Sequence, residues 1–191
     1  MIQRIGTKTI ETERLVLRAF QVSDTDAMFA WASDPAVANN MRYSAHQNRE
    51  ETRQLLQSWE ESYATDPLFF NWAIVLKETG ETIGSIGMVD VDEENRSVAV
   101  GYCMLPSYWG KGIMTEALKR VIRYGFEEIQ FNRIFSYHFL TNPASGRVQQ
   151  KAGMKYEGLL RQYVFVKGKF CDVKLNAIVR DDFEQNKAFY Y

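Results

Sequence analysis

The sequence predicts a single α/β domain with a mixed, mostly antiparallel central sheet. Short apolar runs with strand-like spacing recur along the chain, and segments with one apolar helical face lie between them. The 191 residues are enough to bury one full core, and no repeat, low-complexity segment or linker divides them. We therefore expect one domain over residues 1–191, with a core of about 10–183 and short flexible ends.

The N-terminal third is expected to contain one strand and two helices. Residues 10–19 alternate apolar and polar side chains at their end, which is typical of a half-buried strand. Ser23 is a good N-cap for a helix that ends before Pro35. Residues 36–48 are expected to form a loop or a broken helix, and residues 49–63 place apolar side chains on one helical face.

Three strands and a crossover are expected in the middle of the chain. The apolar runs at 69–76, 82–90 and 97–105 are joined by short turns, which favours an antiparallel meander. An amphipathic helix over 113–128 then leads to a strand at 133–140. A strand reached through a helix can run parallel to its predecessor, so this strand gives the sheet its mixed character.

The last predicted elements are a short helix and a hairpin. The helix covers 142–153, and Asn142 can cap it. Two strands, at 156–166 and 170–179, close the chain as a hairpin, and the tail from Glu184 is expected to fray.

Composition excludes some classes of partner. The formal net charge of −1 gives no electrostatic case for nucleic acid or a membrane surface as the main partner. No apolar run approaches the ~18 residues of a membrane span, and the N-terminus lacks the apolar core of a signal peptide. Together these features predict a cytoplasmic protein.

The sequence predicts no metal site. Cys103 and Cys171 lie in strand-like runs without Cys or His at ligand spacing, which favours reduced, packed thiols. The acidic turn 90–94 lacks the spacing of a calcium loop, so a solvated hairpin turn is the preferred interpretation over a metal site.

The most informative stretch runs from Pro106 to Leu118, where a strand meets a helix through a glycine turn. Glycines allow a tight turn and close approach of a ligand, and helix N-terminal N–H groups favour phosphate. We expect a phosphorylated cofactor near Gly112, unless Gly110 and Gly112 only make a tight turn. The spacing is not that of a Rossmann fingerprint, and no Lys-Ser or Lys-Thr follows as in a Walker P-loop.

Four stretches, in order along nearly the whole chain, carry a family resemblance. They are Thr12-Glu-Arg-Leu-Val-Leu-Arg18; Gly84-Ser-Ile-Gly87; Gly101-Tyr102 through Trp109-Gly-Lys-Gly112 to Glu116-Ala117; and Asn142-Pro-Ala-Ser145 followed by Lys151-Ala-Gly-Met154 and Glu157-Gly158. The chain resembles the GNAT superfamily of acetyl-CoA-dependent N-acetyltransferases, and within it the branch of ribosomal-protein alanine N-acetyltransferases.

The resemblance implies a CoA site. It places the pyrophosphate on the backbone of Trp109, Gly110, Lys111, Gly112, Ile113 and Met114. Trp109 stands where Arg or Gln is usual, and Met114 stands where a small residue is usual. The resemblance also implies a splayed strand pair, with the pantetheine arm along Cys103, Met104 and Leu105 and the thioester near Asn142 and Ser145. Acetyl-CoA is then a cosubstrate, and no metal is needed.

The expected reaction is acetyl transfer to a primary amine by direct attack on the thioester. The amine must lose a proton, the carbonyl oxygen needs a donor, and the leaving thiolate is helped by a hydroxyl. Ser145 is the candidate thiol-side donor by resemblance, although a serine in a first helical turn can also serve only the helix. Asn142 can hold pantetheine, cap its helix, or do both.

The general base is open. Carboxylates that some relatives use are absent, because Ala99 and Val164 stand near those places. The ordinary pKa of a histidine side chain suits a general base, so His138 is a candidate, but packing on the sheet is the preferred interpretation for it. A water relay is an alternative base. His46 lies in the segment expected to cover the acceptor, where a surface position is preferred.

The acceptor is either a protein N-terminus or a small-molecule amine, and residues 36–48 are expected to shape its pocket. A non-catalytic acyl-CoA-binding module is the alternative function, motivated by the missing carboxylates. The edge strands of the C-terminal hairpin could support a homodimer.

Overall fold

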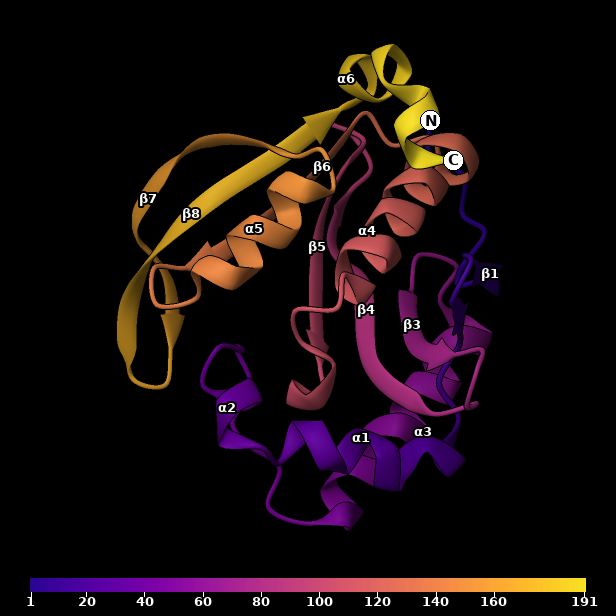
Figure 1. Ribbon diagram of the computed structural model, residues 1–191, viewed down its shortest axis with the longest axis vertical. Helices are drawn as coiled ribbons and strands as arrows, with labels where there is room; N and C mark the ends of the chain where they lie inside the picture. Colours follow the sequence, from indigo (N-terminus) through magenta and orange to yellow (C-terminus); the bar gives the residue numbers. More distant parts are fainter. The chain divides into compact units, whose positions relative to one another are not determined.

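The computed structural model describes residues 1–191, whose eight strands form one sheet in the order β1-β2-β3-β4-β5-β6-β8-β7. The strands are β1 (Ile10–Glu11), β2 (Leu15–Arg18), β3 (Phe70–Leu76), β4 (Thr82–Asp92), β5 (Ser97–Met104), β6 (Arg133–Phe139), β7 (Lys155–Val166) and β8 (Lys169–Val179). The α-helices are α1 (Thr25–Ala32), α2 (Pro35–Ala38), α3 (Arg49–Thr65), α4 (Ile113–Tyr124), α5 (Pro143–Lys151) and α6 (Arg180–Gln185) (Figure 1).

Strand directions confirm the predicted sheet class. β5 and β6 run parallel, as expected for strands joined through a helix. The pairs β1–β2, β2–β3, β3–β4, β6–β8 and β7–β8 are antiparallel. The sheet is therefore mixed and mostly antiparallel.

Contacts divide the chain into two compact units. The N-terminal unit comprises Arg4–Met88 and Gly101–Ile113, and the C-terminal unit comprises Met1–Gln3, Val89–Val100 and Met114–Tyr191. β4 and β5 each contribute residues to both units.

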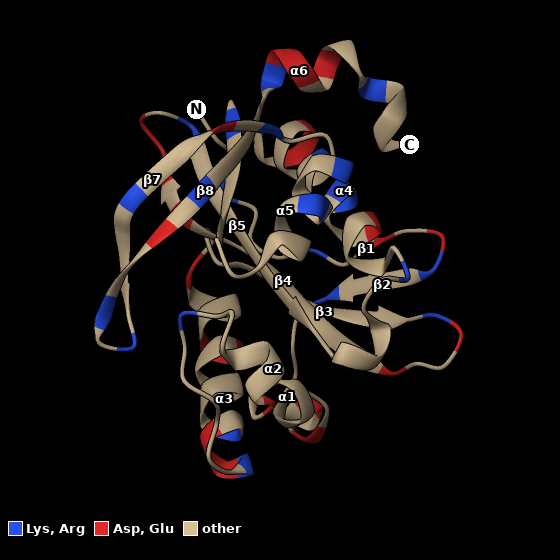
Figure 2. Cartoon of the chain, turned by 60° about the vertical axis from the view of Figure 1, so that its left-hand side comes forward, with Lys and Arg blue, Asp and Glu red and all other residues tan.

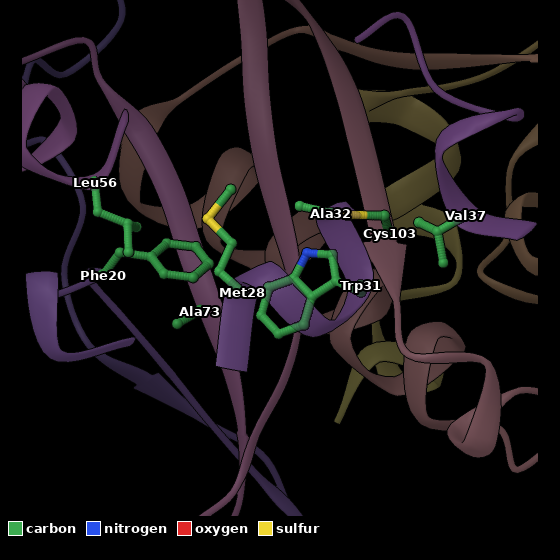
Figure 3. Packing of buried hydrophobic residues seen from close by; sticks show 8 residues of the cluster. All are labelled: Phe20, Met28, Trp31, Ala32, Val37, Leu56, Ala73 and Cys103. Atoms are coloured by element: carbon green, nitrogen blue, oxygen red, sulfur yellow. The ribbon is translucent and has the colours of Figure 1, made fainter. Parts of the chain in front are cut away.

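Helices α1 and α3 supply the core of the N-terminal unit. The apolar cluster contains Phe20, Met28, Trp31, Ala32, Val37, Leu56, Ala73 and Cys103 (Figure 3). Trp31 and Leu56 are fully buried, and burial of a side chain of this size stabilises the fold by about 2–3 kcal/mol. Asn48 sets the start of α3, because its side chain accepts a hydrogen bond of 2.9 Å from the backbone N–H of Glu51.

A partly buried ion pair fixes the entry into α1. The guanidinium of Arg18 donates to both carboxylate oxygens of Asp24, at 2.7 and 2.8 Å. Thr82 also donates to Asp24, at 2.9 Å. Burial by itself would raise the pKa of Asp24, but Arg18, the Gln21 N–H and Thr82 together hold that pKa below its ordinary value.

In the C-terminal unit, β6, β8 and β7 lie side by side and α5 packs against all three (Figure 1). The other face of these strands buries Val164, Val166 and Val173, with Tyr137 and Phe139 packed against them. The hairpin β7–β8 carries mostly cationic charge (Figure 2), and Phe165 and Phe170 are exposed on it with ring centroids 4.9 Å apart.

The N-terminal elements differ from the sequence prediction in two places and agree with it in a third. The expected strand 10–19 is two strands, because the side chain of Thr12 accepts from the Leu15 N–H at 3.0 Å and turns the chain. Ser23 does not cap α1; it lies in a 3₁₀ turn ahead of the helix. The expected loop or broken helix 36–48 begins with the last three residues of α2, which Asp34 caps through the Ala36 N–H at 2.8 Å.

The C-terminal tail is ordered, so the expectation of fraying is wrong. The chain forms α6 and then a 3₁₀ helix over Lys187–Tyr190. Tyr190 is only 7% exposed, and its hydroxyl donates to the Ala152 carbonyl at 3.1 Å. The predicted helix 113–128 is also subdivided, because α4 ends at Tyr124 and continues as a π-helical turn over Gly125–Ile129.

Candidate acetyl-CoA site

The glycine turn between β5 and α4 adopts the conformation that an anion cradle needs. We call Pro106–Gly112 the glycine loop. Gly110 and Gly112 both lie in the left-handed region, with φ of +77° and +76°. Nothing lies within 4 Å of a Cβ built at Gly110, so the backbone conformation is what requires glycine there. α4 begins at Ile113, so its first N–H groups follow the loop directly.

Side chains within the N-terminal unit hold the glycine loop in place. The indole N–H of Trp109 donates to the Met104 carbonyl at 2.9 Å, which ties the loop back onto β5. The Tyr108 hydroxyl donates to the Glu81 carboxylate at 2.5 Å. Trp109 therefore anchors the loop from the position where the resemblance expects Arg or Gln, and backbone donors do not depend on that exchange.

Arg14 is a candidate binding residue that the sequence analysis did not single out. Its Nη1 donates to the Lys111 carbonyl at 3.2 Å, and its Nη2 lies 3.7 Å from a Cβ built at Gly112. It comes from the turn between β1 and β2, within the opening motif of the resemblance. Arg14 and Lys111 thus place two cations at the glycine loop, which favours an anionic ligand there.

The end of β5 is packed closely against β4. A Cβ built at Gly84 would lie 2.5 Å from the Cys103 carbonyl, so only glycine permits this approach. The Leu105 N–H donates to the Ile83 carbonyl at 2.9 Å. The Met104 carbonyl accepts from the Trp109 indole N–H.

Cys103 is a buried thiol within the same segment. Its Sγ lies 3.2 Å from the Ser85 hydroxyl, and burial raises its pKa above the ordinary value of a thiol. Both Cys103 and Cys171 are free cysteines, as predicted. The protonated, buried Cys103 is a packing residue rather than a nucleophile.

The start of α5 brings Asn142 and Ser145 together. The Asn142 side chain accepts from the Ser145 N–H at 3.2 Å, so its predicted role as a helix cap is confirmed. The Ser145 hydroxyl oxygen accepts from Gln149 Nε2 at 3.3 Å. Whether Asn142 also contacts pantetheine stays a prediction.

His138 is buried beneath α5, with 9% of its surface exposed. A Cβ built at Gly146 would lie 2.5 Å from its Cε1 atom, so the helix can pack this closely only through a glycine. Its Nδ1 lies 3.2 Å from the Gln149 side-chain oxygen. Burial lowers the pKa of His138, the nearby charge of Lys174 lowers it further, and the Gln149 contact raises it in part.

One edge of His138 lines a groove between α5 and the β7–β8 hairpin. The groove has a volume of about 420 Å³, and its other lining residues include Arg147, Gln150, Tyr156 and Lys174. Tyr137 points to the opposite face of β6, in ring contact with Tyr163 at 6.0 Å. Tyr137 and His138 therefore lie on opposite faces of β6, and His138 faces α5.

The remaining predicted positions are buried. His46 is 8% exposed, with Nδ1 2.8 Å from the Thr52 hydroxyl, so the preferred surface position was wrong. Ala99 and Val164 are buried apolar side chains, 3% and 5% exposed, and supply no base.

No group of three or more His, Cys, Asp or Glu side chains is arranged to hold a metal ion. None of the helices combines the length and apolar character needed to span a bilayer.

The chain has a glycine turn that leads into an amphipathic helix, on a mixed sheet with one parallel pair, and this arrangement suits a phosphate-bearing ligand in an α/β domain. The family of acetyltransferase (GNAT) domains matches residues 14–155, so the chain belongs to the GNAT acetyltransferase family. The predicted family, fold and class of enzyme are thereby confirmed: the chain is an acyltransferase of the N-acetyltransferase type with acetyl-CoA as donor.

Individual relatives agree with this assignment. The uncharacterised N-acetyltransferase YoaA of Bacillus subtilis is 33% identical over 174 residues, which cover 90% of this chain and 96% of the relative. The ribosomal-protein-serine acetyltransferase of Escherichia coli is 28% identical over 71% of this chain and 74% of its own. A GNAT-family acetyltransferase structure from Bacillus anthracis has a TM-score of 0.81 and 25% identity, covering 91% of this chain and 99% of that one.

Proposed function

We propose that this enzyme transfers an acetyl group from acetyl-CoA to a primary amine by direct attack on the thioester, with a protein N-terminus or a small amine as acceptor. The observation that carries the proposal is the glycine loop. Its two left-handed glycines, its anchors at Met104 and Glu81 and its neighbouring cation Arg14 suit a pyrophosphate group.

The residues proposed to hold the cosubstrate fall into two sets. The pyrophosphate lies on the backbone of residues 109–114, where Trp109 begins the turn with its own N–H held by the Pro106 carbonyl at 3.0 Å. The N–H groups of Gly110, Lys111, Gly112, Ile113 and Met114 donate to it, and Arg14 adds positive charge. The second set, proposed from the resemblance, is Met104, Leu105, Asn142 and Ser145, which contact the pantetheine arm and the thioester. The thioester supplies the activated acetyl group; the chain supplies position and proton transfer.

Ser145 is the proposed proton donor to the leaving sulfur. The amine nitrogen forms a bond to the carbonyl carbon, the carbon–sulfur bond breaks, and the sulfur takes the Ser145 proton. The amine gives up its own proton to a base or a water relay, and a proton returns from that base or relay to the Ser145 oxygen, which restores the hydroxyl. Ser145 suits its role because it is half-buried and its backbone is fixed by Asn142.

His138 stays the candidate base alongside a water relay. Its lowered pKa favours the neutral ring that a base requires, and its burial under α5 equally suits a packing role. Replacing His138 with Gln distinguishes the role of general base from the role of packing residue. If His138 is the base, the variant loses much of its kcat and its pH profile changes. If His138 only packs, the variant loses thermal stability.

The protein is also proposed to act in the cytoplasm as a single domain, and homodimerisation through the C-terminal hairpin stays a prediction. A non-catalytic acyl-CoA-binding module is the second candidate, because no carboxylate occupies the Ala99 or Val164 positions. That candidate predicts CoA binding without turnover.

The test is CoA release from acetyl-CoA against a divided panel of amines. One half contains peptides with free Ala, Ser or Met N-termini, and the other contains amino acids, polyamines and aminoglycosides. We expect Ser145→Ala to lower kcat by about tenfold to a hundredfold while the KM for acetyl-CoA changes by less than about twofold.

Gly112→Trp is the matched control for the cradle. It should abolish acetyl-CoA binding, because Gly112 has a φ of +76° and Arg14 lies beside it. Turnover in one half of the panel identifies the acceptor class. Binding by the wild type without turnover of any amine would contradict the proposed transfer and favour the binding module.

A further inference from the structure

A chain of directed hydrogen bonds begins where β5 and β6 stop pairing. Their parallel register ends at Ala99 and Phe135. The next carbonyl of β5, that of Val100, instead accepts a hydrogen bond of 2.8 Å from the Ser136 hydroxyl. A hydroxyl has a single proton, so Ser136 Oγ can only accept from any further partner.

Gln149 of α5 makes that further contact and is oriented by it. Its Nε2 donates to Ser136 Oγ at 2.9 Å and to Ser145 Oγ at 3.3 Å. Its Oε1 therefore faces the other way, where it accepts from Asn176 Nδ2 at 2.6 Å. Gln149 is completely buried, and both amide protons and the oxygen are used, so the amide has one satisfied orientation.

The orientation of Gln149 fixes the tautomer of His138. Nδ1 of His138 lies 3.2 Å from Gln149 Oε1, and an amide oxygen can only accept, so Nδ1 carries a proton. In the neutral ring the lone pair then belongs to Nε2. The charged and titratable residues that line the groove with His138 are Arg147 of α5, Tyr156 of β7 and Lys174 of β8.

Gln149 directs the Ser145 hydroxyl in the same way. Because Nε2 donates at this contact, Ser145 Oγ accepts and its own proton is directed to a different acceptor. Asn142 meanwhile holds the backbone N–H of Ser145. The buried amide of Gln149 thus sets the direction in which the Ser145 hydroxyl donates and determines which ring nitrogen of His138 carries the proton.

We propose that Gln149 is a positioning residue for acetyl transfer. It holds His138 with its proton on Nδ1, and it holds Ser145 with its hydroxyl proton pointing away from the Gln149 amide. The inference rests on the proposed function for Ser145 and His138. It adds a residue that touches neither substrate and acts through its hydrogen bonds alone.

Three variants separate the effects. Gln149→Met keeps the size of the side chain and removes every hydrogen bond. Gln149→Glu retains an acceptor for His138 and Asn176 but cannot donate to Ser136 or Ser145. Gln185→Met is the matched control, because it makes the same exchange at an exposed residue of α6 that does not line the groove beside His138.

The first readout is the tautomer of His138, followed by ¹⁵N NMR of the imidazole ring. The chain has only two histidines, so the signals are assigned with His138→Gln. We expect the wild type, Gln185→Met and Gln149→Glu to show the proton on Nδ1, and Gln149→Met to show a mixture of tautomers. A wild-type ring with its proton on Nε2, or a Gln149→Met spectrum like the wild type, overturns the proposal.

The second readout is the division of the kinetic effect between kcat and KM. Both Gln149 variants should lower kcat by about tenfold or more, with the KM for acetyl-CoA within about twofold of the wild type. Gln185→Met should match the wild type. A Gln149→Glu enzyme with wild-type kcat overturns the Ser145 part of the proposal, because that variant has no donor to Ser145.

Ser136→Ala covers the case in which Gln149→Met fails to fold. It deletes only one oxygen but removes the group that orients Gln149, so it should also produce mixed tautomers of His138. If the wild type turns over no amine, the proposed function fails, and the NMR result still decides whether Gln149 sets the tautomer.

Discussion

The two histidines show how burial and hydrogen-bond partners determine the protonation of a side chain, which the sequence leaves open. His46 and His138 both lie inside, at 8% and 9% exposure, and each has a side-chain partner at Nδ1. Thr52 offers His46 a hydroxyl that can donate or accept, whereas Gln149 offers His138 an oxygen that can only accept. Sequence identifies both residues as titratable, and only their neighbours decide which nitrogen carries a proton.

The lowered pKa of His138 predicts a pH dependence of stability. The unfolded chain binds a proton at His138 below about pH 6.5, the ordinary pKa, while the folded protein resists it. Stability is therefore present above pH 6.5 and is lost as the pH falls through that value toward the folded pKa. Thermal unfolding at pH 7.5 and 5.5 should show a larger drop in Tm for the wild type than for His138→Gln. Equal drops would contradict the prediction.

At the scale of elements, the contact of α5 with β6 depends on one glycine. Gly146 lies over the His138 ring, and a Cβ there would approach Nε2 to 2.7 Å. The motif Asn142–Ser145 predicted a capped helix, and α5 begins as expected at Pro143. The sequence could not predict that Gly146 sets how closely the helix approaches the strand, because that distance depends on the ring beneath it.

Gly146→Ala should destabilise the protein by about 1–3 kcal/mol, because the helix must rise or the His138 ring must rotate. Gly158→Ala is the matched control, since nothing lies within 4 Å of a Cβ built there. Chemical denaturation measures both. Adding His138→Ala to Gly146→Ala should recover part of the loss, because the space under the helix returns. A loss equal to that of Gly158→Ala would show that the ring does not restrict the helix.

At the scale of the whole molecule, the C-terminal residues complete the core of the unit that contains them. Phe183 stacks on Phe126 with centroids 4.9 Å apart, and Tyr190 packs on Phe183 at 5.0 Å. The sequence suggested a frayed end because the residues from Glu184 onward lie at the chain terminus. The side chains of Phe183 and Tyr190 instead hold this end in the core. Their partners Phe126 and Ala152 are distant from them in the sequence.

Ending the chain after Asn186 should therefore lower the free energy of unfolding by about 2 kcal/mol or more, since it removes the buried ring of Tyr190 and its hydrogen bond to Ala152. Tyr190→Phe removes only the hydrogen bond and should cost about 1 kcal/mol. Thermal unfolding distinguishes the two. A truncated protein with the wild-type Tm would restore the expectation of a frayed tail.

The sequence by itself determined the class of the fold, the order of the main strands and helices, the glycine loop and the family. These follow from local periodicity, turn residues and short motifs, which contiguous residues encode. Only the tertiary structure brought Arg14 to the loop, tied Trp109 to Met104 and connected Ser136, Gln149 and His138. Those contacts join residues on separate elements, and the direction of each hydrogen bond depends on which donors and acceptors folding has already satisfied.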